Sequence, residues 1–144
     1  MRYQWVQRMK SDEPYDLRRR KTYQGSCHCG NTRFEIEANL DHVRVCDCSI
    51  CRRRGALLHR VQPDCFRLLT PIDCLATYSF HTHTARDYFC PKCGILPFRR
   101  PRTDPGVWSV NVRCLHDVDL DADQASLREQ IALTNSGLAF FKYG

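Results

Sequence analysis

Cys27-His28-Cys29 and Cys90-Pro91-Lys92-Cys93-Gly94 place four cysteines in two tight pairs, far apart along the chain. In an extended backbone, residues i and i+2 point to the same face, so both sulfurs of the first pair can reach one metal ion. The second stretch has the form of a zinc-knuckle turn, in which the glycine eases the tight backbone after two sulfurs. Four thiolates fill a tetrahedral site and leave no position for substrate. The sequence therefore predicts a structural zinc that joins the start of the domain to a distant loop.

A third cluster, Cys46-Asp47-Cys48-Ser49-Ile50-Cys51, offers three sulfurs within six residues. Three protein ligands can hold one face of a zinc ion and leave the fourth position for water, a thiolate or a carbonyl oxygen. That layout is typical of a catalytic site. The run Arg52-Arg53-Arg54 follows directly, where it could lower the pKa values of the thiols and attract an anionic substrate.

The sequence leaves open whether a further residue closes this third cluster. Three cysteines lie outside the clusters, in apolar segments where cysteine usually acts as a small buried hydrophobe: Cys65, Cys74 and Cys114. His81 and His83 alternate with threonines, which favours a solvated turn over a metal site. Asp47 and His59 are candidates for a general base through their proximity to the cluster alone.

The composition favours metal binding over disulfides. The chain has 144 residues, enough for one domain with its own core, and its 42% hydrophobic and 26% charged residues are ordinary for a globular protein. Seven of the ten cysteines sit in clusters too tight for structural disulfides. No apolar run has the length of a membrane span, and the N-terminus lacks an apolar secretory segment, so we expect a cytoplasmic protein without membrane contact.

The formal net charge of +6 is unevenly distributed. Residues 1–22 are basic and show no apolar periodicity, so we expect a flexible N-terminal extension, for which nucleic-acid contact is the minority interpretation. We expect the zinc domain over residues 23–120, and a C-terminal helix and tail over residues 121–144.

From Tyr23 onward the pattern is that of β-structure. Residues 32–37 alternate strictly, with Phe34 and Ile36 on one face. Four more segments have the composition of strands and are separated by turn residues: 56–61, 65–69, 75–80 and 107–112. One amphipathic helix is predicted from Gln124 to Leu133. The fold class is therefore mainly β and antiparallel, with one short C-terminal helix.

The cysteine clusters and their flanks occur in a fixed order: Gly25-Ser26-Cys27-His28-Cys29-Gly30-Asn31-Thr32-Arg33-Phe34, then Cys46-Asp47-Cys48-Ser49-Ile50-Cys51-Arg52-Arg53-Arg54-Gly55-Ala56, then Phe89-Cys90-Pro91-Lys92-Cys93-Gly94. Shorter segments at 78–80 and 110–115 continue the pattern. In order and spacing, over about residues 23–120, the chain resembles the glutathione-dependent formaldehyde-activating enzyme family, also called the centromere protein V family. The long N-terminal extension and the segment from Asp121 to Gly144 depart from the family pattern.

The resemblance implies a β-tent, in which short antiparallel sheets stack around zinc. It implies two zinc ions per chain: a structural zinc bound by Cys27, Cys29, Cys90 and Cys93, and a second zinc bound by Cys46, Cys48 and Cys51. It also implies carbon–sulfur lyase chemistry, in which formaldehyde and a small thiol such as glutathione interconvert with an S-hydroxymethyl adduct.

Three hypotheses for function follow. The leading one is a zinc-dependent lyase acting on a thiol–aldehyde adduct; its three thiolates donate much charge, so the site suits a soft sulfur better than water. The alternative is a non-catalytic zinc module whose basic N-terminal arm contacts a protein or a nucleic acid, which requires a fourth protein ligand at the third cluster. A thiol redox protein is a third hypothesis, although zinc masks the thiolates.

Overall fold

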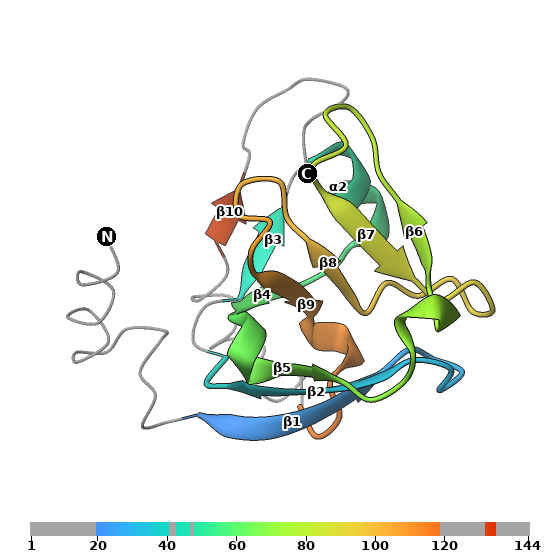
Figure 1. Ribbon diagram of the computed structural model, residues 1–144. Helices are drawn as coiled ribbons and strands as arrows, with labels where there is room; N and C mark the ends of the chain where they lie inside the picture. The colour runs from blue at the N-terminus through green and yellow to red at the C-terminus, as the bar shows by residue number, and fades with distance from the viewer. Residues whose placement is uncertain (1–19, 41–42, 47, 119–131, 135–144) are drawn as a thin grey trace.

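The computed structural model describes residues 20–40, 43–46, 48–118 and 132–134. Over these residues the chain forms a three-stranded and a seven-stranded β-sheet (Figure 1), with one short α-helix and short 3-10 turns. The predicted mainly β fold is confirmed. Within this part of the chain, no helix is both long and apolar enough to cross a membrane.

The small sheet has the order β1-β2-β5 and is antiparallel throughout. Its strands are β1 (Lys21–Ser26), β2 (Arg33–Ala38) and β5 (Phe66–Leu68). The predicted alternation in β2 is confirmed, because Phe34 and Ile36 are buried while their neighbours are not. β1 begins at Lys21, inside the N-terminal extension predicted over residues 1–22. Lys21 and Thr22 pair with the backbone of β2, and their polar side chains gave no sign of this in the sequence.

The large sheet has the order β10-β3-β4-β9-β8-β7-β6. All of its pairs are antiparallel except β10 with β3. Its strands are β3 (Arg44–Cys46), β4 (Leu58–Val61), β6 (Ala76–Tyr78), β7 (Arg86–Phe89), β8 (Phe98–Arg100), β9 (Trp108–Asn111) and β10 (Ala132–Thr134). The segments predicted at 56–61, 65–69, 75–80 and 107–112 contain β4, β5, β6 and β9.

The predicted helix from Gln124 to Leu133 is wrong at its end. Ala132 and Leu133 lie in β10, which pairs in parallel with β3, and residues 124–131 lie outside the described part. Backbone pairing along the edge of β3 outweighs the helical preference of this short segment, because propensity is a weak determinant beside tertiary contacts. The short helix of the described chain is instead α2 (Ser49–Arg54).

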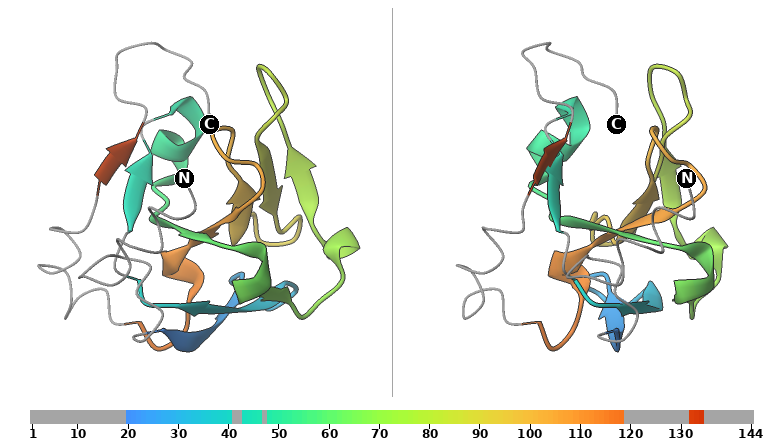
Figure 2. Two further views of the ribbon diagram at one scale, coloured as in Figure 1. Left: turned by 60° about the vertical axis from the view of Figure 1, so that its left-hand side comes forward. Right: turned by 90° about the vertical axis from the view of Figure 1, so that its left-hand side faces the viewer.

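An aromatic cluster joins the two sheets. The ring centroid of Phe34 on β2 lies 5.5 Å from that of Phe98 on β8, in an edge-to-face arrangement. Phe66 on β5 lies 4.6 Å from Trp108 on β9, with the rings stacked. In Figures 1 and 2 the small sheet lies at the bottom of the view and the strands of the large sheet stand above it. These ring contacts contribute beyond the area that they bury.

We expect Gly25→Ala to destabilise the protein by about 1–3 kcal/mol, as overpacking of a core does. A Cβ at Gly25 would collide with the tip of the Phe34 ring, which is fully buried and held by the aromatic cluster. Urea denaturation measures the change. Gly106→Ala is the control, because its Cβ would meet only Asp104 Oδ1 at 3.6 Å. Equal stability of the two variants would contradict the expectation.

Candidate metal centres

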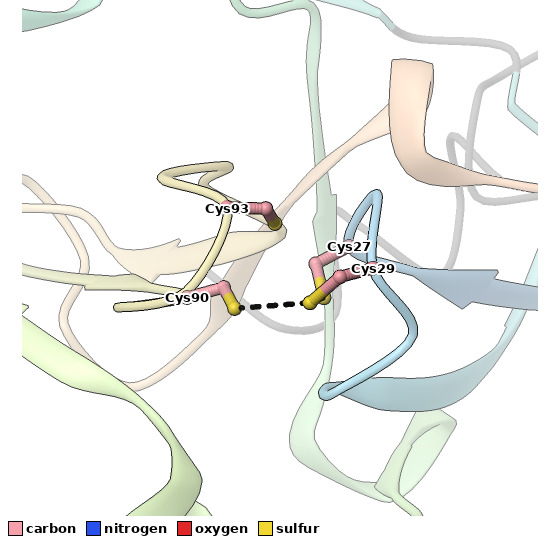
Figure 3. Close-up of side chains that lie close together, drawn as sticks. All are labelled: Cys27, Cys29, Cys90 and Cys93. Carbon is pink, nitrogen blue, oxygen red and sulfur yellow. Dashed lines mark hydrogen bonds between the residues drawn. The ribbon is translucent and has the colours of Figure 1, made fainter.

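Two hairpins from different sheets bring four sulfurs together (Figure 3). Cys27 and Cys29 lie between β1 and β2, and Cys90 and Cys93 lie between β7 and β8. All four sulfurs lie within 4.8 Å of one another, as the two distant cysteine pairs predict. We call this group the four-sulfur cluster.

The spacing of these sulfurs fits a bound ion. The sulfur of Cys29 lies 3.7 Å from that of Cys27 and 3.6 Å from that of Cys90. A disulfide would bring two sulfurs to about 2.05 Å. Tetrahedral coordination with metal–sulfur bonds of about 2.3 Å sets them about 3.8 Å apart. All ten cysteines of the chain lie in the described part and are free thiols, so none of them forms a disulfide.

Backbone hydrogen bonds and glycines with positive φ shape the two turns that carry these cysteines. In the first, the amide of Thr32 donates to the Cys27 sulfur at 3.3 Å, and Gly30 adopts φ +81°. In the second, the amide of Gly94 donates to the carbonyl of Cys90 at 2.8 Å, and Gly94 adopts φ +78°. Both glycines occupy the left-handed region that side chains disfavour, which confirms the turn predicted from Gly94.

The thiols of the four-sulfur cluster do not ionise independently. Burial disfavours the thiolate of Cys93, but backbone amides of Ile95 and Cys29 and the neighbouring thiols outweigh it and lower the pKa of Cys93 to about 6. The amide of Asn31 favours a thiolate at Cys29, yet desolvation and the neighbouring thiols raise the pKa of Cys29 to about 11. One thiolate thus forms at the expense of another, and four together require a cation.

The second group, here called the three-sulfur cluster, is built locally. Cys46 ends β3, Cys48 caps the N-terminus of α2, and Cys51 lies within that helix. Their sulfurs lie within 4.8 Å of one another and the residues are 6%, 0% and 3% exposed. The Cys51 amide donates to the Cys48 sulfur at 3.4 Å. Hydrogen bonds with Cys46 and Cys48, together with burial, raise the pKa of the Cys51 thiol, so this cluster too needs a cation to become ionised.

Within the described chain, no fourth cysteine, histidine or carboxylate joins the three-sulfur cluster. Cys114 is buried as expected, and burial followed by the charges of Cys27 and Cys93 raises its pKa to about 12. Cys65 and Cys74 are only partly buried. Cys65 nevertheless packs against the hydrophobic core, whereas the expectation of a core position is wrong for Cys74, which ends the 3-10 turn Ile72–Cys74.

A cavity of about 420 Å³ adjoins the three-sulfur cluster. Its lining combines the two cysteines at the ends of the cluster with apolar residues and two arginines: Val45, Cys46, Cys51, Arg52, Gly55, Ala56, Leu57 and Arg113. The sequence indicated Arg52 through the arginine run but missed Arg113, which lies in the 3-10 turn Val112–Cys114 and also lines the cavity. The only sequence signal for Arg113 is its place in the matching segment 110–115.

Of the remaining candidates, those that the structure describes do not line this cavity. Arg53 donates to the Ser49 carbonyl at 2.7 Å, and Arg54 binds Asp87, so Arg52 is the member of the run that lines the cavity. His81 and His83 are exposed in a turn, which confirms that prediction. His59 is buried on β4 and is 3% exposed, and Asp47 lies outside the described residues.

The chain is similar to a family model and to a solved structure. A model of the family described as "Glutathione-dependent formaldehyde-activating enzyme" matches residues 22–132. A crystal structure of a Rhodobacter sphaeroides protein superposes with a TM-score of 0.68 at 35% sequence identity. The match covers 77% of this chain and 99% of that one. The family match extends beyond the predicted boundary at residue 120 and includes the first residue of β10.

We expect Cys90→Ser to remove one metal ion per chain and to destabilise the fold by more than about 4 kcal/mol, as loss of a structural metal does. Cys65→Ser is the matched control, because Cys65 belongs to neither cluster. Elemental analysis and urea denaturation measure the two effects. Unchanged metal content in Cys90→Ser would show that the four-sulfur cluster holds no ion.

Proposed function

The chain belongs to the glutathione-dependent formaldehyde-activating enzyme family, and on that premise we propose that it is a zinc-dependent carbon–sulfur lyase. Its substrate would be the adduct of a small thiol and an aldehyde. In the forward direction the sulfur bonds to the carbonyl carbon, and the thiol proton passes to the carbonyl oxygen. The reverse direction breaks that carbon–sulfur bond and releases both partners, and no oxidant or reductant is consumed.

One observation carries the proposal: the three-sulfur cluster borders a cavity. Cys46 and Cys51 belong to both the cluster and the cavity wall. Three protein sulfurs leave a tetrahedral ion one open position, and a catalytic site requires that position to face substrate. Four protein sulfurs would fill the coordination sphere of an ion at the four-sulfur cluster, which supports a structural role there.

The donor sets support zinc at both clusters. Thiolates select soft or borderline metals, and zinc accepts four sulfurs in tetrahedral geometry. Cys27, Cys29, Cys90 and Cys93 would hold one ion, and Cys46, Cys48 and Cys51 would hold the other. When bound at the three-sulfur cluster, zinc supplies a Lewis-acid position that suits the sulfur of a thiol substrate.

The cavity lining supports an anionic adduct as substrate. Val45, Ala56 and Leu57 give it apolar walls next to the three-sulfur cluster. Arg52 and Arg113 add two positive charges, which can each bind a carboxylate through two parallel hydrogen bonds. Glutathione carries two carboxylates and a thiol, so its aldehyde adduct matches this combination.

The binding-module hypothesis has less support. It requires a fourth protein ligand at the three-sulfur cluster, and the described residues provide none. Residues 1–19, which contain most of the basic arm, lie outside the described part of the chain. The lyase proposal therefore remains the better supported of the two.

We expect Cys48→Ser to lower the metal content from about two zinc ions per chain to about one and to abolish turnover of S-hydroxymethylglutathione. Cys48 is fully buried within the three-sulfur cluster, and the described residues offer no other cysteine, histidine or carboxylate there to replace its sulfur. Elemental analysis and an assay of formaldehyde release measure the two effects. Cys74→Ser is the control, and full turnover by Cys48→Ser would exclude the mechanism.

We expect Arg113→Gln to raise KM for S-hydroxymethylglutathione about tenfold, because a charge-assisted hydrogen bond to a carboxylate contributes about 1.5–3 kcal/mol. The KM for the adduct of the uncharged thiol 2-mercaptoethanol should not change. Arg67→Gln is the control, since Arg67 pairs with Glu35 on the small sheet. Equal effects on both adducts would contradict a role in binding the anion.

A further inference from the structure

Two different elements hold the sulfurs of the three-sulfur cluster. Cys48 caps α2 and Cys51 lies within it: the Cys51 amide donates to the Cys48 sulfur at 3.4 Å, and the Arg52 amide donates to the Cys48 carbonyl at 3.0 Å. The helix therefore fixes these two sulfurs relative to each other. Cys46 lies on β3 instead, so the position of the third sulfur depends on what holds that strand.

β3 lies between β10 and β4 in the large sheet. β4 pairs with it at its first residue, Arg44. β10 runs parallel to all three residues of β3, and its register sets Thr134 beside Cys46. Figures 1 and 2 show β10 alongside β3. Among the described strand pairs, the one that reaches the metal-ligand end of β3 is therefore the pair with β10.

β3 also provides part of the cavity wall. Val45 and Cys46 both line the cavity, and Leu133 of β10 pairs with Val45. In the described part of the chain, β10 pairs with β3 alone, because it is the end strand of the sheet order. Its backbone pairing thus acts on the strand that carries both the third sulfur and a section of the cavity wall.

This pairing comes from a late part of the chain. The family match covers residues 22–132, so Leu133 and Thr134 lie beyond its end. These are the two residues of β10 that pair with Val45 and Cys46. The contact with the ligand end of β3 is therefore made by residues of this chain that the family model does not include.

We propose that β10 is a positioning element of the three-sulfur centre: its backbone pairing with β3 holds Cys46 where it can share an ion with Cys48 and Cys51, and holds Val45 in the cavity wall. The inference rests on the proposed function, since it takes this cluster to hold zinc. Removing a group that orients a metal ligand typically lowers metal affinity by about 10- to 100-fold. Coupling between two sites is reciprocal, so an ion at this centre would also hold β10 on β3.

The test places proline in β10 of the full chain. Successive N–H groups of a strand point to opposite sides, so one of Leu133 and Thr134 donates toward β3 and the other away from it. Proline removes the N–H, and strands tolerate it where that group faces away from the neighbouring strand. Leu133→Pro and Thr134→Pro are therefore matched controls for each other. Leu133→Ala and Thr134→Ala keep the N–H and control for loss of the side chain.

Hydrogen exchange of the β3 amides identifies the proline that opens the pairing. We expect that variant to bind zinc at the three-sulfur centre about tenfold more weakly in competition with a chelator, and to keep the affinity of the four-sulfur centre. In Co²⁺-substituted protein it should also lose intensity in the sulfur-to-cobalt charge-transfer bands, which a strand that merely stabilises the sheet would not change. By reciprocity, Cys48→Ser should speed the exchange of the β10 amides.

Faster exchange of the β3 amides with unchanged zinc affinity would show that β10 merely covers the edge of the sheet, and would overturn the inference. Two prolines that change neither quantity would overturn it too, as would equal losses at both centres or equal losses in the alanine controls. Wild-type protein with one zinc would overturn the proposed function. Two zinc ions, bound equally tightly by wild type and by the variant that opens β3, would overturn the role of β10 alone.

Discussion

The convergence of four sulfurs from two separate sheets is the constraint on which the rest of the structure depends. The hairpin between β1 and β2 and the hairpin between β7 and β8 each contribute two of them, so the four-sulfur cluster fixes one sheet against the other. The neighbouring thiols raise the pKa of Cys29 and lower that of Cys93, and a cation bound between the four sulfurs would favour the thiolate form of all of them. The aromatic contacts between Phe34, Phe98 and Trp108 then fill the space between the sheets.

The two clusters differ in how far apart their cysteines lie in the sequence, and therefore in how much a bound metal would constrain the fold. The four-sulfur cluster joins segments that are distant in sequence, so a metal there closes a long loop and stabilises the fold. The three-sulfur cluster takes its residues from β3 and α2, which are adjacent in the chain, and therefore adds little constraint on topology. This cluster adjoins a cavity at the end of the large sheet away from the small one. Its position suits ligand binding better than a role in joining the two sheets.

Cysteine spacing sufficed to predict the three-sulfur cluster and each pair of the four-sulfur cluster, because C-x-C and C-x-x-C geometry is local. The meeting of the two distant pairs was predicted because neither pair completes a tetrahedral site alone. Alternation sufficed for β2, where one face is apolar, and strand composition sufficed for β9. The sequence did not reveal β7 and β8, because their buried Asp87 and Arg99 look like surface residues and are paired only in the folded chain, Asp87 with both Arg99 and Arg54. β10 was missed for a related reason, since its strand conformation depends on the edge of β3. Arg113 required the tertiary structure, because only the cavity associates it with Cys46.

Charge balance connects the two clusters to the basic composition of the chain. If both clusters are loaded, seven thiolates and two Zn²⁺ ions contribute −3 to a chain whose formal charge is +6, which leaves +3. Several arginines of the described residues are engaged within the protein: Arg54 and Arg99 with Asp87, and Arg67 with Glu35. Zinc-loaded thiolate clusters would thus offset part of the formal positive charge of the chain. The charge that remains is weak evidence for a polyanionic partner at the surface, whereas the two arginines of the cavity lining favour an anionic ligand there.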